Sequence, residues 1–371
     1  MKVIIAAAGT GGHINPAIAI ANKIKAEEPH SKIVFFGTER GIENDLVPRA
    51  GYELKHIEAY GLKKEISIKN FKNIMKTVNS TKIVKKFIDK FKPDLVIGTG
   101  GYICGPVFAA ANSRKIPTIL HESNAFPGKA VRMFAKKADK VLVGFDEAKK
   151  MLPKNTNVVT TGNPTKVQKH EITEDRKQEL LQELGLKKDL PIILVTGGSQ
   201  GAQRINEAIL EILSKNLNKD YQILWATGPK QYDIVKENLK NRSLNIEKLT
   251  NAKILPYIYN MEEVLNLMDL EVCRSGAMTI TELSNVGKPA IFIPLPSVGA
   301  NKQEDNARVL EKLGAARVIL NNELDYNKLN TSIYELISKP AKLAEMGHKA
   351  MKIEAKNVEE KIYKEIKKIV K

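Results

Sequence analysis

The sequence Gly-Thr-Gly-Gly occurs twice, at residues 9–12 and 98–101, and each copy follows a run of apolar residues. Glycines at the end of a strand let the backbone approach a ligand and leave the N–H groups of the next helix available for anionic groups. His13 follows the first copy directly, and imidazole titrates near neutral pH, as a general base should. The first copy therefore predicts either a ligand-binding turn with His13 as a base or an ordinary strand-to-helix turn.

Two further polar segments follow apolar runs. For His121-Glu122-Ser123-Asn124 the choice lies between ligand-binding side chains and a buried histidine with a helix-capping asparagine. Gly197-Gly198-Ser199-Gln200-Gly201 precedes a helical pattern, and its N–H groups with the Ser199 hydroxyl suit a diphosphate. This second segment lacks the Gly-Lys-Ser/Thr of a Walker A loop.

Cys273–Glu282 is the most informative segment, because an apolar run ends there in Arg-Ser-Gly-Ala and a helical pattern begins. The N–H groups and dipole of such a helix start favour phosphates. Glu282, one turn further on, is placed to accept hydrogen bonds from both hydroxyls of a ribose. The alternative is a capping box, in which Glu282 pairs with Thr279 three residues earlier.

Motifs of several other chemistries do not occur in the sequence. It has no Asp-x-Asp triplet and no His/Cys spacing of a zinc site. We therefore expect no metal, and we expect helix dipoles, backbone donors and basic side chains to meet the charge of a diphosphate. Asn301–Ala307 begins another helical pattern, and its amide side chains suit the hydroxyls of a sugar.

The elements that must position these residues are short β-branched runs alternating with amphipathic helical patterns. Apolar strands with helical crossovers indicate parallel sheets covered on both faces. The predicted strands are Val3–Ala8, Lys32–Gly37, Asp94–Gly98, Pro117–His121, Val141–Val143, Val158–Thr160, Ile192–Thr196, Tyr221–Ala226, Lys253–Leu255, Leu270–Cys273, Ala290–Pro294 and Ala316–Ile319. The predicted helices include Pro16–Glu28, Val107–Arg114, Thr173–Leu184, Ala202–Ser214, Thr279–Val286 and Gln303–Lys312.

The pattern begins again near residue 191, where a new strand and glycine turn mirror residues 3–12. A chain of 371 residues is also too long to fold around a single hydrophobic core of ordinary size. We therefore predict an α/β protein of two doubly wound, Rossmann-like domains facing each other across a cleft, residues 1–162 and residues 163–349. Ligands are expected beyond the carboxyl ends of the strands. The charged helical pattern at about 350–371 is expected to pack back on the first domain.

The composition does not decide among several classes of partner. The net charge of +17 suits nucleic acid, an anionic membrane or phosphorylated substrates, but the lysine-rich excess comes without the aromatic platforms of a nucleic-acid binder.

The cysteines and the apolar segments bear on the location of the protein. Cys104 and Cys273 lie in apolar contexts, which favours a reducing compartment. The apolar start at residues 1–9 is too short for a signal sequence, and no run reaches the roughly 18 apolar residues that cross a bilayer. We expect a soluble or peripheral protein.

Residues 62–92 combine ten lysines with a high density of apolar residues. This pattern is typical of a helix that lies in a membrane interface, with a lysine-rich flank beside an apolar face. The alternative is a surface helix whose apolar side belongs to the core. The segment has too many apolar positions for one buried stripe, so we expect some of them to face lipid or a partner.

Together, the order and spacing of five segments resemble the MurG family of peptidoglycan N-acetylglucosaminyltransferases: Gly9–His13, His121–Asn124, Gly162–Pro164, Gly197–Ala202 and Cys273–Glu282. The resemblance implies a GT-B fold and inverting transfer of GlcNAc from UDP-GlcNAc to the C4 hydroxyl of an undecaprenyl-linked muramyl-peptide acceptor (lipid I), which gives lipid II for the cell wall. It implies neither metal nor cofactor, and a peripheral place on the anionic cytoplasmic face of the cell membrane. The first domain would bind acceptor and membrane, and the second would bind the donor.

The resemblance also implies roles for single residues. His13 is the implied base, with Glu122 as second candidate. The implied donor contacts are Thr10, Gly11, Gly12, Asn124, Lys166, Ser199, Ile258, Ala277, Met278, Thr279, Ile280, Thr281, Glu282 and Gln303. The chain departs from the family at Ser123, where glutamine is frequent, at Lys166, where arginine is common, and at Lys302, where histidine is frequent. A lysine keeps the charge of arginine but lacks its two-point hydrogen bonding.

Three other functions fit part of the sequence. The nearest alternative is a transferase that glycosylates diacylglycerol. Assays with a muramyl-peptide acceptor and with diacylglycerol would distinguish it from an N-acetylglucosaminyltransferase of the MurG family. A sugar-nucleotide epimerase on the same two-domain scaffold is disfavoured because no carboxylate cluster is evident. A basic nucleic-acid-binding protein would explain the charge but not the two Gly-Thr-Gly-Gly turns, so we expect no nucleic-acid partner.

Overall fold

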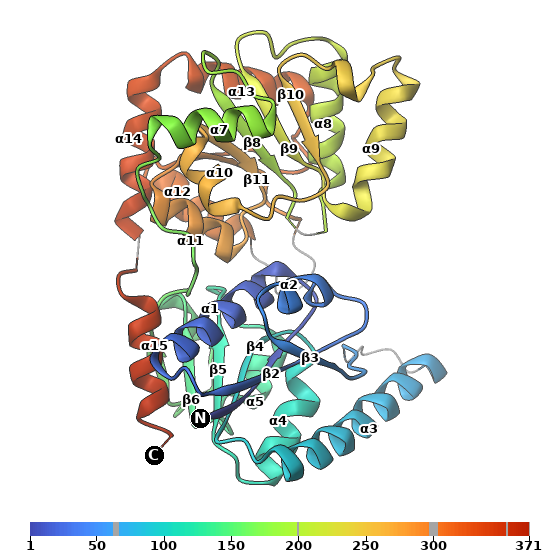
Figure 1. The fold of residues 1–371 in the computed structure, drawn as a ribbon, viewed down its shortest axis with the longest axis vertical. Coiled ribbons are helices and arrows are strands. Elements are labelled where there is room, and N and C mark those ends of the chain that lie inside the picture. The colour runs from blue at the N-terminus through green and yellow to red at the C-terminus, as the bar shows by residue number, and fades with distance from the viewer. Residues whose placement is uncertain (62–66, 199, 297–302, 354, 371) are drawn as a thin grey trace. The chain divides into compact units, whose positions relative to one another are not determined.

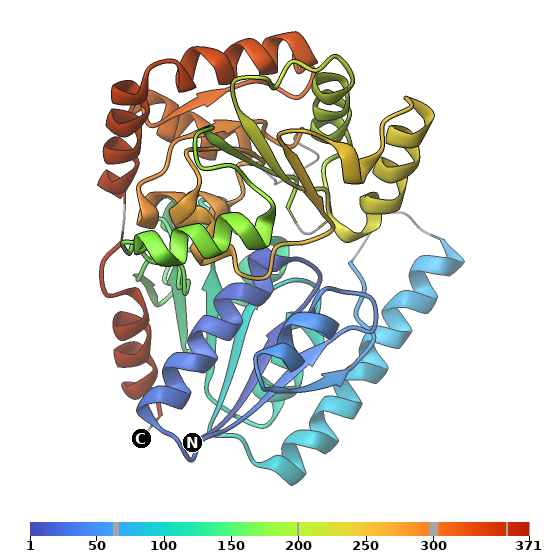
Figure 2. The same ribbon diagram turned by 45° about the horizontal axis from the view of Figure 1, so that its top comes forward.

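The computed structural model describes residues 1–61, 67–198, 200–296, 303–353 and 355–370, and the chain divides into two compact units. Unit 1 comprises Met1–Thr165 and Ala355–Lys371, and unit 2 comprises Lys166–Glu354. Each unit is a parallel β-sheet with helices on both faces (Figure 1 and Figure 2). The predicted pair of Rossmann-like domains is therefore confirmed.

Unit 1 has a seven-stranded sheet in the order β3-β2-β1-β4-β5-β6-β7, with all neighbouring strands parallel. Its strands are β1 (Lys2–Ala7), β2 (Lys32–Gly37), β3 (Glu53–His56), β4 (Leu95–Gly100), β5 (Thr118–Glu122), β6 (Lys140–Val143) and β7 (Val158–Thr160). Its helices are α1 (Gly11–Glu27), α2 (Glu43–Arg49), α3 (Ile68–Phe91), α4 (Cys104–Ser113), α5 (Lys129–Phe134), α6 (Glu147–Lys150) and α15 (Val358–Lys367).

Unit 2 has a six-stranded parallel sheet in the order β10-β9-β8-β11-β12-β13. Its strands are β8 (Ile192–Thr196), β9 (Gln222–Ala226), β10 (Ala252–Leu255), β11 (Leu270–Cys273), β12 (Ala290–Phe292) and β13 (Ala316–Val318). Its α-helices are α7 (Glu174–Leu184), α8 (Gln203–Ser214), α9 (Pro229–Asn241), α10 (Met261–Leu267), α11 (Ala277–Val286), α12 (Gln303–Lys312), α13 (Tyr326–Ile337) and α14 (Pro340–Ala350).

Both sheets reverse their strand order at one place, between β1 and β4 in unit 1 and between β8 and β11 in unit 2. The loops that follow the strands on the two sides of such a reversal diverge, which opens a crevice at the carboxyl edge of the sheet. The first glycine turn of unit 1 follows β1, and the second comprises the last three residues of β4 and the residue after it. In unit 2 the corresponding places hold the glycine turn after β8 and the Arg-Ser-Gly segment after β11. The fold thus brings the predicted ligand-binding segments of each unit to one edge.

The central strands are buried because their residues are apolar on both faces. In β1, Ile4 and Ala6 pack with α4, whereas Val3, Ile5 and Ala7 pack with α1 and α15. Successive side chains of a strand point to opposite faces, so each central strand contributes to two apolar layers. This double burial explains why the sequence shows continuous apolar runs rather than alternation.

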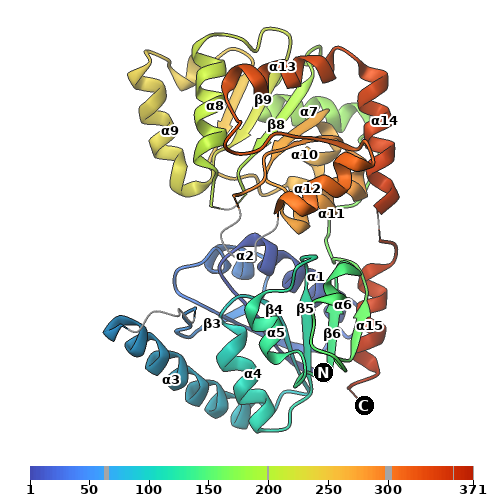
Figure 3. The same cartoon turned by 180° about the vertical axis from the view of Figure 1, so that it is seen from behind.

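The chain returns to unit 1 at its end. Val358, Ile362 and Ile366 of α15 join the apolar layer beneath α1, and Lys140 of β6 pairs with the buried Glu365. Figure 3 shows α15 against the elements of unit 1 from behind. The helical pattern predicted from about residue 350 forms α15 only from Val358, because Asn357 adopts a left-handed conformation (φ 55°) directly before this helix.

The sequence did not predict β3. Its residues Glu53-Leu54-Lys55-His56 are mostly polar and partly or fully exposed, and the strand lies at the edge of the sheet. An edge strand is covered less than a central one, so it carries no continuous apolar run that marks it in the sequence.

Candidate active site

The first glycine turn fixes the ring of His13. Gly9 has φ 97°, and α1 begins directly after Thr10. The Nδ1 atom of His13 lies 3.0 Å from the carbonyl oxygen of Ala8. A carbonyl only accepts hydrogen bonds, so Nδ1 carries the proton and Nε2 carries the lone pair of the neutral ring. The His13 side chain is half-buried, whereas Gly9 and Thr10 are exposed.

The second glycine turn forms the surface against which the His13 ring packs. Gly100 has φ 119°, and a Cβ atom built on it would lie 2.5 Å from Cδ2 and 2.8 Å from Nε2 of His13. The hydroxyl of Thr99 donates to the carbonyl oxygen of His13 at 2.7 Å. The two glycine turns therefore lie side by side, and the second needs glycine at position 100.

The segment after β5 combines a structural histidine with an oriented asparagine. His121 is fully buried, and burial lowers its pKa to about 4, so the ring is neutral near pH 7. The Glu122 carboxylate accepts from the N–H and the side-chain amide of Asn124, both at 2.9 Å, and from the N–H of Gly128 at 2.7 Å. These bonds fix the orientation of the Asn124 amide and leave its oxygen and its second N–H available to a ligand. Glu122 thus acts on the shape of this loop.

The start of α11 is a helix end without a side-chain cap. Gly276 is the N-cap residue, and glycine has no side chain that could cap the first turn. The capping-box alternative for Thr279 and Glu282 is therefore wrong, because Thr279 already lies inside the helix. The side chains of Ala277, Met278 and Ile280 are buried, so these three residues offer only backbone groups at the helix start.

Thr279, Thr281 and Glu282 are partly exposed on the same helix. The Thr281 hydroxyl donates to the carbonyl oxygen of Ala277 at 2.9 Å.

The strand before this helix, β11, carries two buried titratable groups. Glu271 is fully buried and accepts from the Thr196 hydroxyl at 2.7 Å, and burial raises the pKa of Glu271 to about 7. Burial also raises the pKa of the Cys273 thiol, with the Glu271 and Glu282 carboxylates adding to the effect. Cys273 is thus an inert thiol in an apolar layer.

Ser275 ties the loop after β11 to the start of α12. Its hydroxyl donates to the carbonyl oxygen of Gln303 at 2.7 Å, and the N–H of Leu295 donates to the side-chain oxygen of Gln303 at 3.0 Å. The side-chain nitrogen of Gln303 is then the group that can donate to a ligand. Arg274 donates to the carbonyl oxygens of Ile293 and Pro294 at 2.9 and 3.1 Å, and burial lowers its pKa to about 10.

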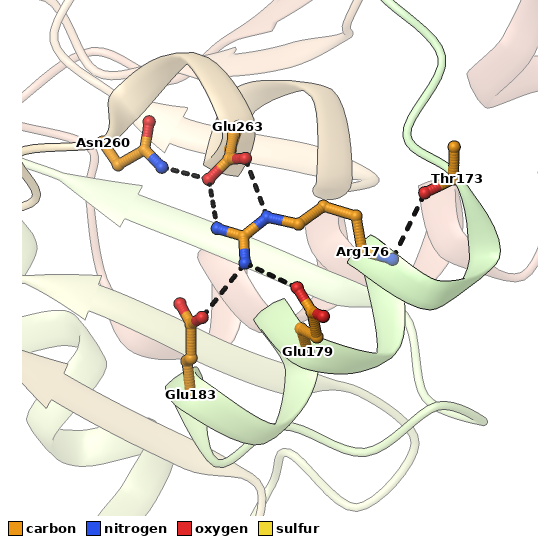
Figure 4. A network of polar contacts seen from close by, with 6 residues as sticks. All are labelled: Thr173, Arg176, Glu179, Glu183, Asn260 and Glu263. Atoms are coloured by element: carbon orange, nitrogen blue, oxygen red, sulfur yellow. Dashed lines mark hydrogen bonds and ion pairs between the residues drawn. The ribbon is translucent and has the colours of Figure 1, made fainter.

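The remaining predicted donor contacts have different surroundings. Ile258 is buried, so only its backbone is available to a ligand. It precedes α10, which Figure 4 shows joined to α7 through Arg176 and Glu263. Lys166 is exposed at the start of unit 2. Ser199 lies outside the described residues.

Three residues that support the site were not predicted as site residues: Thr99, Ser275 and Glu271. Thr99 has a signal in the sequence, because it repeats the position that Thr10 has in the first glycine turn. Ser275 belongs to the Arg-Ser-Gly segment, but its bond to Gln303 joins residues 28 positions apart. Glu271 stands in an apolar strand, and nothing local shows that Thr196 will pair with it.

Helix α3 carries apolar side chains on two faces. Val84 and Ile88 are buried, with Phe87 and Phe91 packed beside them. Phe71, Ile74, Met75 and Val78 are exposed, and at 100° per residue they lie roughly opposite the buried set. The expected surplus of apolar positions is therefore present. Within the described ranges, no helix is both long and apolar enough to cross a bilayer.

Comparisons with known proteins agree over the whole chain. The model of the glycosyltransferase family 28 N-terminal domain matches residues 3–143, and that of the C-terminal domain matches residues 192–365. Two relatives are named UDP-N-acetylglucosamine–N-acetylmuramyl-(pentapeptide) pyrophosphoryl-undecaprenol N-acetylglucosamine transferase. The one from Thermoanaerobacter sp. (strain X514) is 44% identical and covers 100% of both chains. The one from Acetivibrio thermocellus is 42% identical and covers 100% of this chain and 99% of its own.

Among solved structures, MurG of Acinetobacter baumannii superposes with a TM-score of 0.70 at 26% identity, covering 99% of each chain. The family models, the full-length relatives and this structure point to the same group of enzymes. The chain therefore belongs to the MurG family within glycosyltransferase family 28.

Proposed function

We propose that the chain transfers GlcNAc from UDP-GlcNAc to the C4 hydroxyl of the muramyl unit of an undecaprenyl-linked muramyl-peptide acceptor, converting lipid I into lipid II. The observation that carries the base of this reaction is the His13 ring, whose Nδ1 is committed to Ala8 and whose Nε2 therefore holds the lone pair. A group that removes a proton needs such a lone pair at a defined place.

Unit 2 is proposed to bind the donor. The uncapped start of α11 at Gly276–Thr279 would meet the diphosphate through backbone N–H groups and the helix dipole. The same groups would stabilise the charge that grows on the departing UDP, without a metal ion. Glu282 is proposed for the ribose hydroxyls, Gln303 for GlcNAc and the backbone of Ile258 for uracil. Ser199 and Lys166 remain proposed contacts to the phosphates.

Unit 1 is proposed to bind the acceptor and to supply the base. Thr10, Gly11, Gly12 and Asn124 are also proposed to contact the donor. His13 Nε2 would take the proton of the acceptor's C4 hydroxyl as its oxygen attacks C1 of GlcNAc, which inverts the configuration at C1. Glu122 is the second candidate for the base, but its two oxygens already accept three hydrogen bonds from Asn124 and Gly128.

The exposed stripe of α3, Phe71, Ile74, Met75 and Val78, is proposed to lie in the anionic cytoplasmic surface of the cell membrane, where the lipid-linked acceptor is held. Lys72, Lys82 and Lys86 are exposed on the same helix and would meet lipid phosphates. The Phe71→Ser/Met75→Ser double variant should sediment less with phosphatidylglycerol vesicles, yet keep its turnover of a short-chain acceptor. Ile234→Ser removes another exposed apolar side chain, from α9, and should change neither the sedimentation nor the turnover. Unchanged sedimentation of the double variant would exclude α3.

The decisive experiment is turnover of UDP-GlcNAc with a short-chain lipid I analogue, with and without chelator, and with diacylglycerol as the competing acceptor. We expect the muramyl acceptor to be glycosylated and diacylglycerol not to be, and we expect the chelator to have no effect on the rate. His13→Ala should lower kcat by roughly 100-fold or more, the range of a lost general base. His30→Ala is the matched control, because His30 is exposed in the turn that follows the far end of α1, and it should leave kcat unchanged. If His13→Ala kept near-normal kcat, the base would have to be assigned to another group.

A further inference from the structure

Glu43, the first residue of α2, is a buried carboxylate at the base of the first glycine turn. Its side chain has no exposed surface. One carboxylate oxygen, Oε2, accepts from the N–H of Gly9 at 2.9 Å. The other, Oε1, accepts from the N–H of Thr38 at 2.9 Å and from its hydroxyl at 2.8 Å. Three such donors hold the carboxylate in one orientation.

The backbone around Glu43 is shaped to admit this side chain. A Cβ atom at Gly41 would lie 1.8 Å from Oε2 of Glu43, and one at Gly37 would lie 2.8 Å from its Cγ. Any other residue at Gly41 would displace the carboxylate. The glycines at both positions thus keep the carboxylate within reach of Gly9.

The hydrogen bonds of Glu43 and His13 meet on one peptide group. The N–H of Gly9 donates to Glu43, and the C=O of the same peptide, which belongs to Ala8, accepts from His13 Nδ1 at 3.0 Å. Hydrogen bonds in such a chain polarise one another, so a negative charge on the N–H side strengthens the C=O as an acceptor. We propose that Glu43 is a positioning residue that holds His13 in its Nδ1-protonated form through the Ala8–Gly9 peptide.

The consequence for the reaction concerns two states of His13. In the neutral ring, the strengthened bond at Nδ1 keeps the lone pair on Nε2, where a base needs it. After the ring has taken the acceptor's proton at Nε2, the same bond faces a full positive charge and becomes stronger. The arrangement resembles a carboxylate beside a catalytic histidine, with a peptide group inserted between them. This inference rests on the proposed role of His13 as the base.

Glu43→Gln tests the relay, because glutamine keeps the shape but has no charge and only one acceptor oxygen. Either Gly9 or Thr38 then loses its acceptor. We expect kcat to fall roughly 10-fold to 100-fold, as for partners that orient a functional group through a hydrogen bond. KM for UDP-GlcNAc should change less than kcat, because most of the proposed donor contacts lie in unit 2. Nitrogen NMR of the His13 ring should show a smaller Nδ1-protonated population.

Asp139→Asn is the matched control. Asp139 also accepts from the N–H and hydroxyl of a threonine, Thr118, at 2.7 and 3.2 Å, but it lies at the opposite end of the same sheet. This variant should leave kcat and the His13 ring signals as in the wild type. A loss of kcat in both variants would indicate general destabilisation of unit 1 and would contradict the relay.

A double variant separates the relay from the base assignment. In a His13→Ala background, Glu43→Gln should have no further effect on kcat, and an equal fold-loss in both backgrounds would overturn the relay. If His13→Ala itself kept normal kcat, the base proposal would fail, while the ring NMR of Glu43→Gln would still decide the relay. Should Glu43→Gln not fold, the wild-type protein remains a test: a His13 ring protonated at Nε2 in its neutral form excludes the proposal.

Discussion

Arg176 of α7 and Glu263 of α10 form a two-point ion pair, with 2.9 Å between Nε and Oε1 and 2.8 Å between Nη2 and Oε2. Arg176 also donates to Glu179 and Glu183 from Nη1, and Asn260 donates to Glu263, so the network extends to the residue before α10 (Figure 4). Ile258 lies two residues further upstream. The network therefore holds α10, and with it the segment proposed to contact uracil, against α7.

Arg176→Lys should weaken UDP binding although Arg176 is not a proposed ligand contact. Lysine cannot make the two-point bond, so the start of α10 loses its fixed position. We expect the dissociation constant of UDP, measured by calorimetric titration, to rise roughly twofold to tenfold, the range for residues that act on a site from outside it. Arg242→Lys is the control, since Arg242 makes a one-point pair with Glu211 between α8 and α9. Equal effects of both variants would contradict the prediction.

The buried Glu271 should make the stability of unit 2 fall as pH rises. Its pKa is about 7 in the folded protein, above the ordinary value of 4.5, so the folded state holds a proton that the unfolded state releases. The stability is complete below about pH 4.5 and is lost as pH rises towards 7, with a total change of about 3 kcal/mol. Glu271→Gln should remove this slope. Trp225, the single tryptophan, is buried in β9 and its fluorescence reports unfolding of unit 2 in denaturant.

Glu237→Gln on the exposed side of α9 serves as the control for this titration. It should unfold with the same pH dependence as the wild type. A Glu271→Gln protein that still loses stability between pH 4.5 and 7 to the wild-type extent would show that another group carries the slope.

Gly100→Ala should impair both the fold and the reaction. The new Cβ would overlap the His13 ring, and φ 119° is strained for any residue with a side chain, at a cost of about 1–3 kcal/mol. We expect kcat to fall at least tenfold because Nε2 of His13 moves. Gly105→Ala in α4 has open space around its Cβ and should leave kcat unchanged, with a slightly higher melting temperature. Normal kcat of Gly100→Ala would mean that the ring position is not critical.

Ile362→Ala tests how firmly α15 belongs to unit 1. Ile362 is 1% exposed in the apolar layer beneath α1, so the cavity should cost about 2–5 kcal/mol of the stability of unit 1. Ile234→Ala on the exposed face of α9 should cost less than about 0.5 kcal/mol. Circular dichroism during denaturant unfolding measures the loss, and Trp225 fluorescence shows whether unit 2 is spared. An Ile362→Ala protein as stable as the wild type would mean that α15 is only loosely attached.

The ends of the central strands were predicted to within two residues, because double burial leaves continuous apolar runs such as Ile192–Thr196. The glycine turns were also predicted, because glycine is the residue that readily adopts the positive φ angles such turns require. The polar edge strand β3 was not predicted, nor was the break at Asn357. Hydrogen bonds between residues far apart in the sequence could not be predicted either. Nothing near Glu43 in the sequence shows that its carboxylate accepts from the N–H of Gly9, 34 residues earlier. Pairings of this kind depend on which loops the finished sheet brings together.

Unit 1 is made of two segments of the sequence, Met1–Thr165 and Ala355–Lys371, and unit 2 is inserted between them. During synthesis, residues 1–165 leave the ribosome while α15 has not yet been made. At the usual rate of translation, the wait lasts on the order of ten seconds or more. Throughout that time, the apolar residues beneath α1 that α15 will cover have only solvent or a chaperone against them. Refolding of a nascent chain arrested before residue 355 would therefore differ from refolding of the complete protein.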